Sequence, residues 1–479
     1  MASITGDTQP HHVVLFPFMS KGHTIPILHL ARLLLHRRLI VTFFTTPANR
    51  PFIFESLNDT TVTILDLPFS HNVPDIPVGI ESTDKLPSMS MFYAFGNATK
   101  LMQPDFERAI QTLPRVSFIV SDGFLWWTLE SASKFDIPRF VFCGMNYYST
   151  SVIRAVDQDR LLFVPESDDE LITVTRFPWI KVTRNDFESP YTESEPKGLI
   201  YEFIMNVIVA ETKSYGIIVN SFYELESVFA DYWNRECQPK PWSVGPLCLA
   251  EPPKARDEPY NNKPKWVHQW LDKKFDQGNS VLYIAFGSQV EISLAQLKEI
   301  AIGLEESKVN FLWVIRKSES EISDGFEERV NDRGIVVREW VDQREILMHE
   351  SVQGFLSHCG WNSVLESICA GVPILAWPMM AEQPLNARMV VEEIKVGLRV
   401  ETCDGSVRGF VKWEGLEKTV KELMEGEKGK EVRKKCMEVT EKAKKAMEEG
   451  GSSKCTLDLL IDETYGKTTS SDVCNVTWV

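Results

Sequence analysis

Short apolar runs alternate with amphipathic segments along most of the chain. Residues 12–18 (HVVLFPF) are nearly all apolar, which is typical of a strand buried on both faces of a parallel sheet. Apolar residues then recur at helical spacing from 25 to 35, and Pro26 suits the first turn of a helix. Five further apolar runs predict strands at 39–46, 61–67, 116–122, 139–143 and 216–222. This alternation of strands and helices predicts an α/β fold.

A proline-rich stretch divides the chain into two halves. Seven prolines fall between residues 239 and 264, with charged and polar residues between them. Proline lacks a backbone donor, so this composition neither continues a helix nor pairs as a central strand, and it indicates a linker. The alternation then resumes, with strands expected at 281–288, 311–315, 334–340, 354–360 and 372–378, a helix at 293–307 and a charged helical tail at 412–449.

This pattern predicts two α/β domains of similar size. We place an N-terminal domain at 1–240, a linker at 241–265 and a C-terminal domain at 266–479. The last helix of the chain is free, in this scheme, to pack back on the N-terminal domain.

Composition and charge restrict the function classes. The chain has 479 residues, of which 43% are hydrophobic and 25% charged, so it can build sizeable cores and is not a disordered or fibrous protein. Its formal net charge is −16, whereas a nucleic-acid binder or a protein docked on anionic lipid needs a basic surface. An anionic small ligand is still compatible, because a local site can override the net field.

The cysteines and the N-terminus indicate the compartment. Nine scattered cysteines without a C-x-x-C pair suggest neither a disulfide framework nor a zinc site. The first residues lack the basic and apolar regions of a signal peptide. No apolar run approaches the roughly 18 residues of a membrane span. We therefore expect a cytoplasmic protein with no membrane span and no nucleic-acid partner.

The strongest local pattern is SHCGWNSVLES at 357–367. A buried strand is expected to end near His358, with a turn at Gly360 and a helix from about Asn362. Helix N-termini present free N–H groups and a partial positive charge, so this junction suits a diphosphate, with His358 and Ser363 as further donors. The alternative is a simple helix cap by Asn362 or Ser363. The pattern alone leaves both interpretations open.

Other nucleotide and nucleophile motifs are missing from the sequence. There is no G-x-x-x-x-G-K-[ST] and no G-x-G-x-x-G after a strand, so the usual signatures of nucleoside triphosphatases and nicotinamide dehydrogenases are absent. The G-x-S-x-G elbow that carries the nucleophile of α/β-hydrolases is absent as well.

A histidine and an aspartate follow two predicted strands of the N-terminal half. His23 comes shortly after the first strand, and Asp122 ends the strand at 116–122. Open α/β sheets bind ligands at the carboxyl ends of their strands. A carboxylate beside the far nitrogen of an imidazole fixes its tautomer, so the pair suits a general base. The alternatives are that His23 caps or donates at a helix start and that Asp122 caps the next helix.

Taken together, these residues resemble a known family. The segment 340–383, WVDQREILMHESVQGFLSHCGWNSVLESICAGVPILAWPMMAEQ, closely resembles the 44-residue signature box of plant UDP-dependent glycosyltransferases. It matches in length, in its opening Trp340, in HCGWNS and in its closing Gln383. The family is also matched by GHTIP at 22–26, the serine–aspartate step at 121–122 and AFGS at 285–288.

The resemblance implies the GT-B fold, in which two facing Rossmann-like domains enclose the active-site cleft. It implies that His23 is the catalytic base and that Asp122 supports it. It places the UDP-sugar in the C-terminal half. The uracil and ribose are expected beside Trp340, Gln343 and Glu366, and the sugar beside Glu382 and Gln383. The diphosphate is expected beside Ser288, His358, Trp361, Asn362 and Ser363.

The resemblance also implies the reaction. We expect inverting transfer of a sugar from UDP-sugar to a hydroxyl of a small apolar or phenolic plant metabolite, such as a flavonoid, with a β-glycoside as product. Glucose is the expected sugar because the box closes with Gln383. The UDP-sugar is a co-substrate, so no cofactor is expected. No D-x-D motif is present to hold a metal. We expect a monomer.

Two departures leave the finer sugar preference open. Glu382 stands where many members have Asp, and CGMN at 143–146 lacks a hydroxyl where some relatives place a threonine. The alternatives are transfer from UDP-galactose, UDP-xylose, UDP-rhamnose or UDP-glucuronic acid, a non-catalytic UDP-sugar sensor, and a two-domain periplasmic-type binding protein. The missing signal peptide and the signature box disfavour the last of these.

Overall fold

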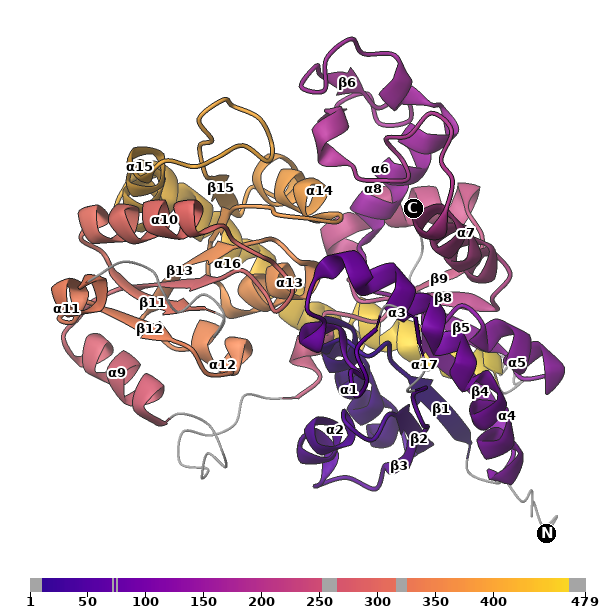
Figure 1. Cartoon of the computed structure of the whole chain (residues 1–479). Coiled ribbons are helices and arrows are strands. Elements are labelled where there is room, and N and C mark those ends of the chain that lie inside the picture. Colours follow the sequence, from indigo (N-terminus) through magenta and orange to yellow (C-terminus); the bar gives the residue numbers. More distant parts are fainter. Residues whose placement is uncertain (1–10, 71–72, 75, 252–264, 316–324, 465–479) are drawn as a thin grey trace.

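The computed structural model describes residues 11–70, 73–74, 76–251, 265–315 and 325–464. Within these ranges the chain forms two parallel sheets with helices packed around them (Figure 1). We call the first sheet with its helices the N-terminal domain and the second sheet with its helices the C-terminal domain. The α/β class expected from the alternating pattern is confirmed.

The first sheet has the strand order β3-β2-β1-β4-β5-β8-β9, and all its neighbouring strands are parallel. Its strands are β1 (His12–Phe16), β2 (Ile40–Thr45), β3 (Thr63–Asp66), β4 (Val116–Asp122), β5 (Arg139–Cys143), β8 (Gly216–Val219) and β9 (Pro241–Ser243). The helices of this half are α1 (Lys21–His36), α2 (Arg50–Leu57), α3 (Phe92–Ala98), α4 (Gln103–Thr112), α5 (Thr128–Lys134), α6 (Tyr147–Gln158), α7 (Leu199–Thr212) and α8 (Tyr223–Glu236). A small antiparallel pair, β6 (Ile172–Thr173) and β7 (Lys181–Val182), lies apart from the sheet.

The second sheet has the order β12-β11-β10-β13-β14-β15 and is also parallel throughout. Its strands are β10 (Val281–Ala285), β11 (Asn310–Val314), β12 (Gly334–Val337), β13 (Val352–Ser357), β14 (Ile374–Ala376) and β15 (Gly397–Arg399). The remaining helices are α9 (Lys265–Asp276), α10 (Leu294–Ser307), α11 (Phe326–Val330), α12 (Gln343–Leu347), α13 (Trp361–Ala370), α14 (Gln383–Arg388), α15 (Trp413–Met424), α16 (Glu427–Met447) and α17 (Ser452–Thr464).

Strand register decides which loops meet at the carboxyl edge of each sheet. In the first sheet Phe16 at the end of β1 pairs with Ser121 near the end of β4. In the second, Ala285 at the end of β10 pairs with Ser357 at the end of β13. Every residue of β1 is buried, as its continuous apolar run predicts. The loops after these four strands therefore lie next to each other within their own sheets.

The proline-rich stretch contributes a strand, which corrects the expected linker. Pro241–Ser243 forms β9 at the edge of the first sheet, parallel to β8, and Val244 and Leu247 are buried in the same core. Proline is tolerated as the first residue of an edge strand, because no ladder bond from its nitrogen is needed there. The N-terminal domain thus extends to about residue 250, and most of the expected linker, 252–264, lies outside the described residues.

The last helix returns to the N-terminal domain. Leu457, Leu460 and Ile461 of α17 are buried in the same hydrophobic cluster as Val13 and Leu15 of β1. Figure 1 shows α17, in yellow, among the elements of the first sheet. The chain therefore crosses between the domains a second time at its end, which ties the two sheets together.

A shared core and buried polar contacts join the two domains. One hydrophobic cluster contains both Tyr147 and Val219 of the N-terminal domain and Trp361 of the C-terminal domain. Beside it, Arg388 of α14 donates to buried Asp186 over 2.9 Å. A buried ion pair fixes relative position more than it adds stability, because desolvation offsets much of its attraction.

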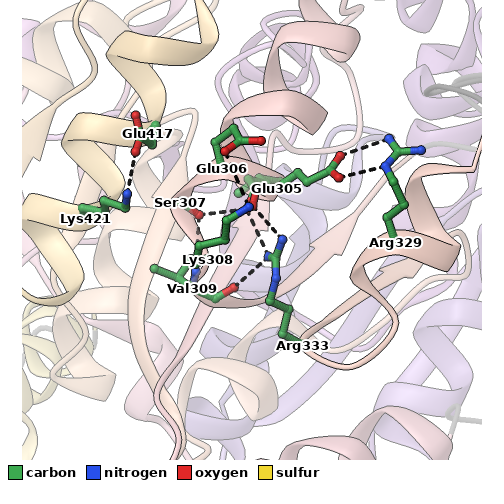
Figure 2. Close-up of polar contacts among 10 residues, drawn as sticks. Glu305, Glu306, Ser307, Lys308, Val309, Arg329, Arg333, Glu417 and Lys421 are labelled. Atoms are coloured by element: carbon green, nitrogen blue, oxygen red, sulfur yellow. Dashed lines mark hydrogen bonds and ion pairs between the residues drawn. The ribbon is translucent and has the colours of Figure 1, made fainter.

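Other ion pairs on the C-terminal domain join neighbouring helices of that domain. Arg329 of α11 forms a two-pronged pair with Glu305 of α10, at 2.8 and 3.0 Å, and Arg333 donates to the carbonyl oxygen of Glu305 (Figure 2). Exposed pairs of this kind contribute about 0–1 kcal/mol each. They hold α11 to α10 and are separate from the domain contacts described above. In the described part of the chain, no helix is long and apolar enough to cross a membrane.

The packing of α17 on the first sheet predicts that two adjacent leucines contribute very differently to the free energy of unfolding. Leu460 is fully buried, whereas Leu459 is 49% exposed. Leu460→Ala should lower the free energy of unfolding by about 2–5 kcal/mol, because it removes buried methyl groups and leaves a cavity. Leu459→Ala is the matched control and should change it by less than ~0.5 kcal/mol. Urea denaturation measures both. Equal losses would contradict the packing of α17 on the first sheet.

Candidate active site

His23 and Asp122 are brought together at the carboxyl edge of the first sheet. His23 lies in the first turn of α1, and Asp122 ends the neighbouring strand β4. The Nδ1 of His23 lies 2.8 Å from Oδ2 of Asp122. Asp122 is buried, while the imidazole remains partly exposed. The contact leaves Nε2 as the nitrogen that can exchange a proton with a ligand.

Opposing effects set the pKa of His23. Burial disfavours the charged imidazole, whereas the Asp122 carboxylate and its hydrogen bond, together with Glu382 of the other domain, favour it. The balance raises the pKa of His23 above its ordinary value. A raised pKa makes the imidazole a stronger base once it is neutral.

Asp122 is held on several sides. Its Oδ1 accepts from the Phe124 amide over 2.9 Å, which leaves Oδ2 for His23. The buried guanidinium of Arg139 donates to the Asp122 carbonyl over 3.2 Å and to Ser121 Oγ over 2.9 Å. The carboxylate therefore has a fixed orientation before any ligand binds.

Two aromatic rings lie beside the His23 imidazole, and further rings pack against them. The imidazole lies 5.0 Å from the Phe124 ring and 5.5 Å from that of Phe18, measured between centroids. Phe92 lies 5.7 Å from Phe124 and 5.4 Å from Tyr93. Phe18 is buried, but Phe92, Tyr93 and Phe124 retain exposed surface. Phe92, Tyr93 and Phe124 form an aromatic wall, which offers apolar, planar contact area beside His23 and Asp122.

The start of α13 forms the centre of the candidate donor site. Gly360 precedes the helix, and the first bond back to it is the Val364 amide to the Gly360 carbonyl, 3.1 Å. The amides of Trp361, Asn362 and Ser363 come before that bond in the helix, so they can bind an anion. Ser288 lies exposed in the turn after β10.

His358 lies between two glycines at this junction. A Cβ atom at Gly287 would lie 2.8 Å from Nε2 of His358, and one at Gly360 would lie 2.6 Å from it. Gly287 also has a φ of +78°, which favours glycine. Burial lowers the pKa of His358 to about 4. The imidazole is therefore neutral at pH 7 and can donate an N–H.

Trp361 is turned away from this site. Its indole is buried, and its Nε1 donates to the Asn220 carbonyl of the N-terminal domain over 2.7 Å. A donor could contact Trp361 only through its backbone amide, and its place beside the diphosphate stays a prediction. The indole instead joins the domains.

Gln343, Ser363 and Glu366 form one polar cluster. Gln343 Nε2 donates to Ser363 Oγ over 2.8 Å and to Glu366 Oε2 over 2.7 Å, and Tyr283 donates to Gln343 Oε1 over 3.4 Å. Burial raises the pKa of Glu366 to about 7, although the bond from Gln343 opposes the shift. The cluster thus holds a carboxyl group that can accept from a diol when ionised.

Trp340 lies opposite the N-terminal domain. The indole is 49% exposed and lies edge-on to Phe52 of α2, with centroids 6.2 Å apart. The ammonium of Lys21 lies 5.6 Å from the same ring. The side chain therefore has free surface for a planar group, and α1 and α2 border it.

Glu382 and Gln383 begin α14, after β14. Gln383 Oε1 accepts from the amides of both Met379 and Met380 over 3.0 Å, so its nitrogen is the end that can donate to a ligand. Glu382 accepts from Asn386 over 3.3 Å, and burial raises the pKa of Glu382. Glu382 lies close enough to His23 of the other domain for its charge to favour the imidazolium.

The C-terminal domain directly contacts the start of the helix that bears His23. Asn362 Nδ2 donates to the Gly22 carbonyl over 2.5 Å. Gln289 Nε2 donates to Ser20 Oγ over 3.1 Å and to Thr83 Oγ1 over 2.7 Å. The candidate base and the candidate diphosphate site are therefore joined through hydrogen bonds.

No group of three or more His, Cys, Asp or Glu residues suited to a metal ion occurs in the described ranges. The polar groups gathered here are instead hydrogen-bond donors and carboxylates from both domains. This set suits an uncharged polyol on a diphosphate, with a general base on the opposite side.

Comparison with known proteins also points to an enzyme that uses a sugar on a diphosphate. The family model described as UDP-glucoronosyl and UDP-glucosyl transferase matches residues 258–441. UDP-glycosyltransferase 90A1 of Arabidopsis thaliana is 59% identical to this chain, over 95% of this chain and 97% of that protein. The chain belongs to the plant UDP-glycosyltransferase family. The expected family, and with it the enzyme class, are confirmed, and the alternative of a periplasmic-type binding protein is wrong.

Solved structures of family members share the fold. Glycyrrhiza uralensis UGT73P12, complexed with glycyrrhetinic acid 3-O-monoglucuronide, has a TM-score of 0.85 and 30% identity, covering 95% of this chain and 96% of that one. Phytolacca americana UGT2, complexed with UDP-2fluoro-glucose and pterostilbene, has a TM-score of 0.77 and 27% identity, covering 95% of this chain and 100% of that one. The GT-B fold is thus confirmed. Both of these family members hold small molecules in their structures.

Sequence reasoning missed several residues of this interface. Asn220 accepts from Trp361, donates to Asn362 over 3.4 Å and accepts from the Leu247 amide over 2.8 Å. Asn220 lies inside the strand predicted at 216–222, whereas β8 ends at Val219 in the structure, so no strand-end signal singled it out. Asn146, within the departing segment CGMN, caps α6 and donates to Asn386 over 2.8 Å. No sequence pattern indicates that second contact, since it joins residues 240 positions apart.

The contact between His23 and Asp122 predicts that the pKa of His23 shifts when the carboxylate is removed. Asp122→Asn removes the carboxylate that favours the imidazolium, so the pKa of His23 should fall, and protonated His23 should be lost at lower pH than in the wild type. The NMR signal of the His23 ring proton, followed against pH, measures this. Glu305→Gln removes a carboxylate from the distant pair in Figure 2 and should leave the signal's midpoint unchanged. An unmoved midpoint in Asp122→Asn would contradict the contact.

Proposed function

We propose that this UDP-glycosyltransferase transfers glucose from UDP-glucose to a hydroxyl of a small phenolic or apolar metabolite, with inversion to a β-glycoside. The observation that carries the proposal is the His23–Asp122 contact of 2.8 Å, placed across the interface from Glu382 and joined to the start of α13. The arrangement provides a base, a sugar site and an anion site in one place.

In this mechanism His23 removes the proton of the acceptor hydroxyl. The base is the neutral imidazole, and Asp122 fixes its tautomer and stabilises the imidazolium that forms. The acceptor oxygen attacks the anomeric carbon while the bond to UDP breaks. Attack from the face opposite UDP inverts that carbon.

The leaving diphosphate is stabilised by the start of α13. The amides of residues 361–363 and the neutral imidazole of His358 supply donors to the charge that develops. We propose that these groups replace a metal ion. Trp340 offers its exposed face to uracil, and Glu366 accepts from the ribose hydroxyls through its ionised form.

Glucose is favoured by the groups that face the sugar. Gln383 presents its N–H groups, and Glu382 presents a carboxylate, which suits a neutral polyol. A UDP-glucuronic acid donor would place a second carboxylate near Glu382, and like charges repel. A strawberry relative from Fragaria ananassa, 34% identical, is named UDP-glucose flavonoid 3-O-glucosyltransferase 7. These points support glucose over an acidic sugar.

A phenolic acceptor is favoured by the aromatic wall of Phe92, Tyr93 and Phe124. A planar ring can stack there with its hydroxyl near His23. We extend the proposal to a cytoplasmic monomer, as expected from the sequence. The test is transfer from UDP-glucose to two phenols, pterostilbene and quercetin, with 3,4-dichloroaniline as an acceptor that has an amine but no hydroxyl. Mass spectrometry reads the product as a hexosyl gain. These compounds are found in complexes of solved relatives.

The first variant test is directed at the proposed base, His23. His23→Ala should leave UDP affinity near normal, since the donor groups lie in the C-terminal domain. Transfer to a hydroxyl should fall by about 10²–10⁴-fold, the usual worth of a general base. Asp122→Ala should cost the same or less, and the double variant far less than the product of both losses, because the pair acts as a unit. Steady-state kinetics with calorimetry of UDP binding measures this.

The result can contradict the proposal in two ways. Wild-type turnover in His23→Ala would show that the base is wrong. Loss of UDP binding together with turnover would show that His23 is structural.

Gln383 gives a second test, directed at the sugar. Gln383→Glu keeps an oxygen for the amides of Met379 and Met380 but removes the N–H donors. We expect kcat/KM for UDP-glucose to fall by about 3- to 10-fold, the worth of one or two hydrogen bonds. Gln353→Glu, whose amide donates to the Glu350 carbonyl, is the matched control. Unchanged kcat/KM in Gln383→Glu would exclude a sugar contact.

A further inference from the structure

A proline lies inside the helix that bears His23. Pro26 is the sixth residue of α1, not a residue of its first turn, and it is buried. Proline has no N–H, and its ring crowds the carbonyl four residues earlier. In α1 that carbonyl belongs to Gly22, which lies directly before His23 and is exposed. The helix therefore leaves the Gly22 oxygen without its normal partner and turned outward.

That oxygen is taken by the C-terminal domain. Asn362 Nδ2 donates to it over 2.5 Å, and Asn362 is itself held on its other side by Asn220 over 3.4 Å. An amide nitrogen has two N–H groups, so one bond to Gly22 leaves a second for a diphosphate. A Cβ at Gly22 would meet no atom within 4 Å, so there is open space beside this contact.

We propose that Pro26 is a positioning residue for transfer: by freeing the Gly22 carbonyl, it lets Asn362 hold the base helix against the donor domain. The inference rests on the proposed function, because it assumes that His23 is the base and that α13 binds the diphosphate. The side chain of Asn362 then sets the distance between the base, His23, and the diphosphate site at the start of α13.

The alternative is that Pro26 only shapes the fold of the N-terminal domain. The two explanations differ in what happens when the proline is replaced. Pro26→Ala supplies an N–H that can bond to Gly22 within the helix, so Asn362 must compete for the same oxygen. A purely structural proline would change stability, whereas a positioning proline changes turnover through Asn362.

The experiment is a double-variant cycle with Pro26→Ala, Asn362→Ala and the pair combined. UDP-glucose and quercetin are the probe substrates, at a temperature where circular dichroism shows all variants folded. We expect Pro26→Ala to lower kcat by about 3- to 30-fold, between the worth of one hydrogen bond and that of a misplaced base. In the Asn362→Ala background it should lower kcat by less than about twofold, since the partner is gone.

Pro104→Ala is the matched control. Pro104 is exposed and directly follows the 3-10 helix Thr99–Met102, so a new N–H there faces the Lys100 carbonyl, which already accepts from the Gln103 amide. It should leave kcat unchanged. Wild-type kcat in Pro26→Ala, or losses that multiply in the double variant, would overturn the inference. If His23→Ala retains turnover, the proposed base fails instead, so the two failures are distinguishable.

Discussion

The site depends on the pairing of parallel strands whose carboxyl ends lie side by side. Pairing of β1 with β4 puts the loop and the helix start that follow β1 beside the last residue of β4, which is why His23 and Asp122 meet. Pairing of β10 with β13 does the same for Gly287 and His358. Parallel sheets place all such ends on one edge, so each domain presents one polar edge and buries the rest.

Joining the carboxyl edges of the two sheets requires buried polar groups that hydrogen-bond to one another. Asn146, Ser149 and Asn386 are fully buried and bonded across the interface. An unpaired amide in such a place would cost about 1–3 kcal/mol, so the network resists separation of the domains and opposes other alignments. The return of α17 and the shared core reinforce it. The edges therefore meet in one arrangement, with the base opposite the helix start.

Burial also sets the protonation states across the site. It lowers the pKa of His358 to about 4 and raises that of Glu366 to about 7, while Asp122 and Glu382 outweigh burial at His23. The two histidines thus take different roles, His358 as a neutral donor and His23 as a base, while Glu366 accepts only when it is ionised. Burial and charged partners, rather than residue type, separate the two histidines.

The sequence by itself determined the two α/β halves, the family and most of the polar residues near the site. It could do so because buried strands leave continuous apolar runs and because strand ends and helix starts are local features. It placed the domain boundary too early, since edge strand β9 begins with a proline. Only the tertiary structure decided that Trp361 faces the other domain, that Asn146 meets Asn386, and that Asn362 takes the carbonyl freed by Pro26. These contacts join residues more than a hundred positions apart, and no local periodicity encodes them.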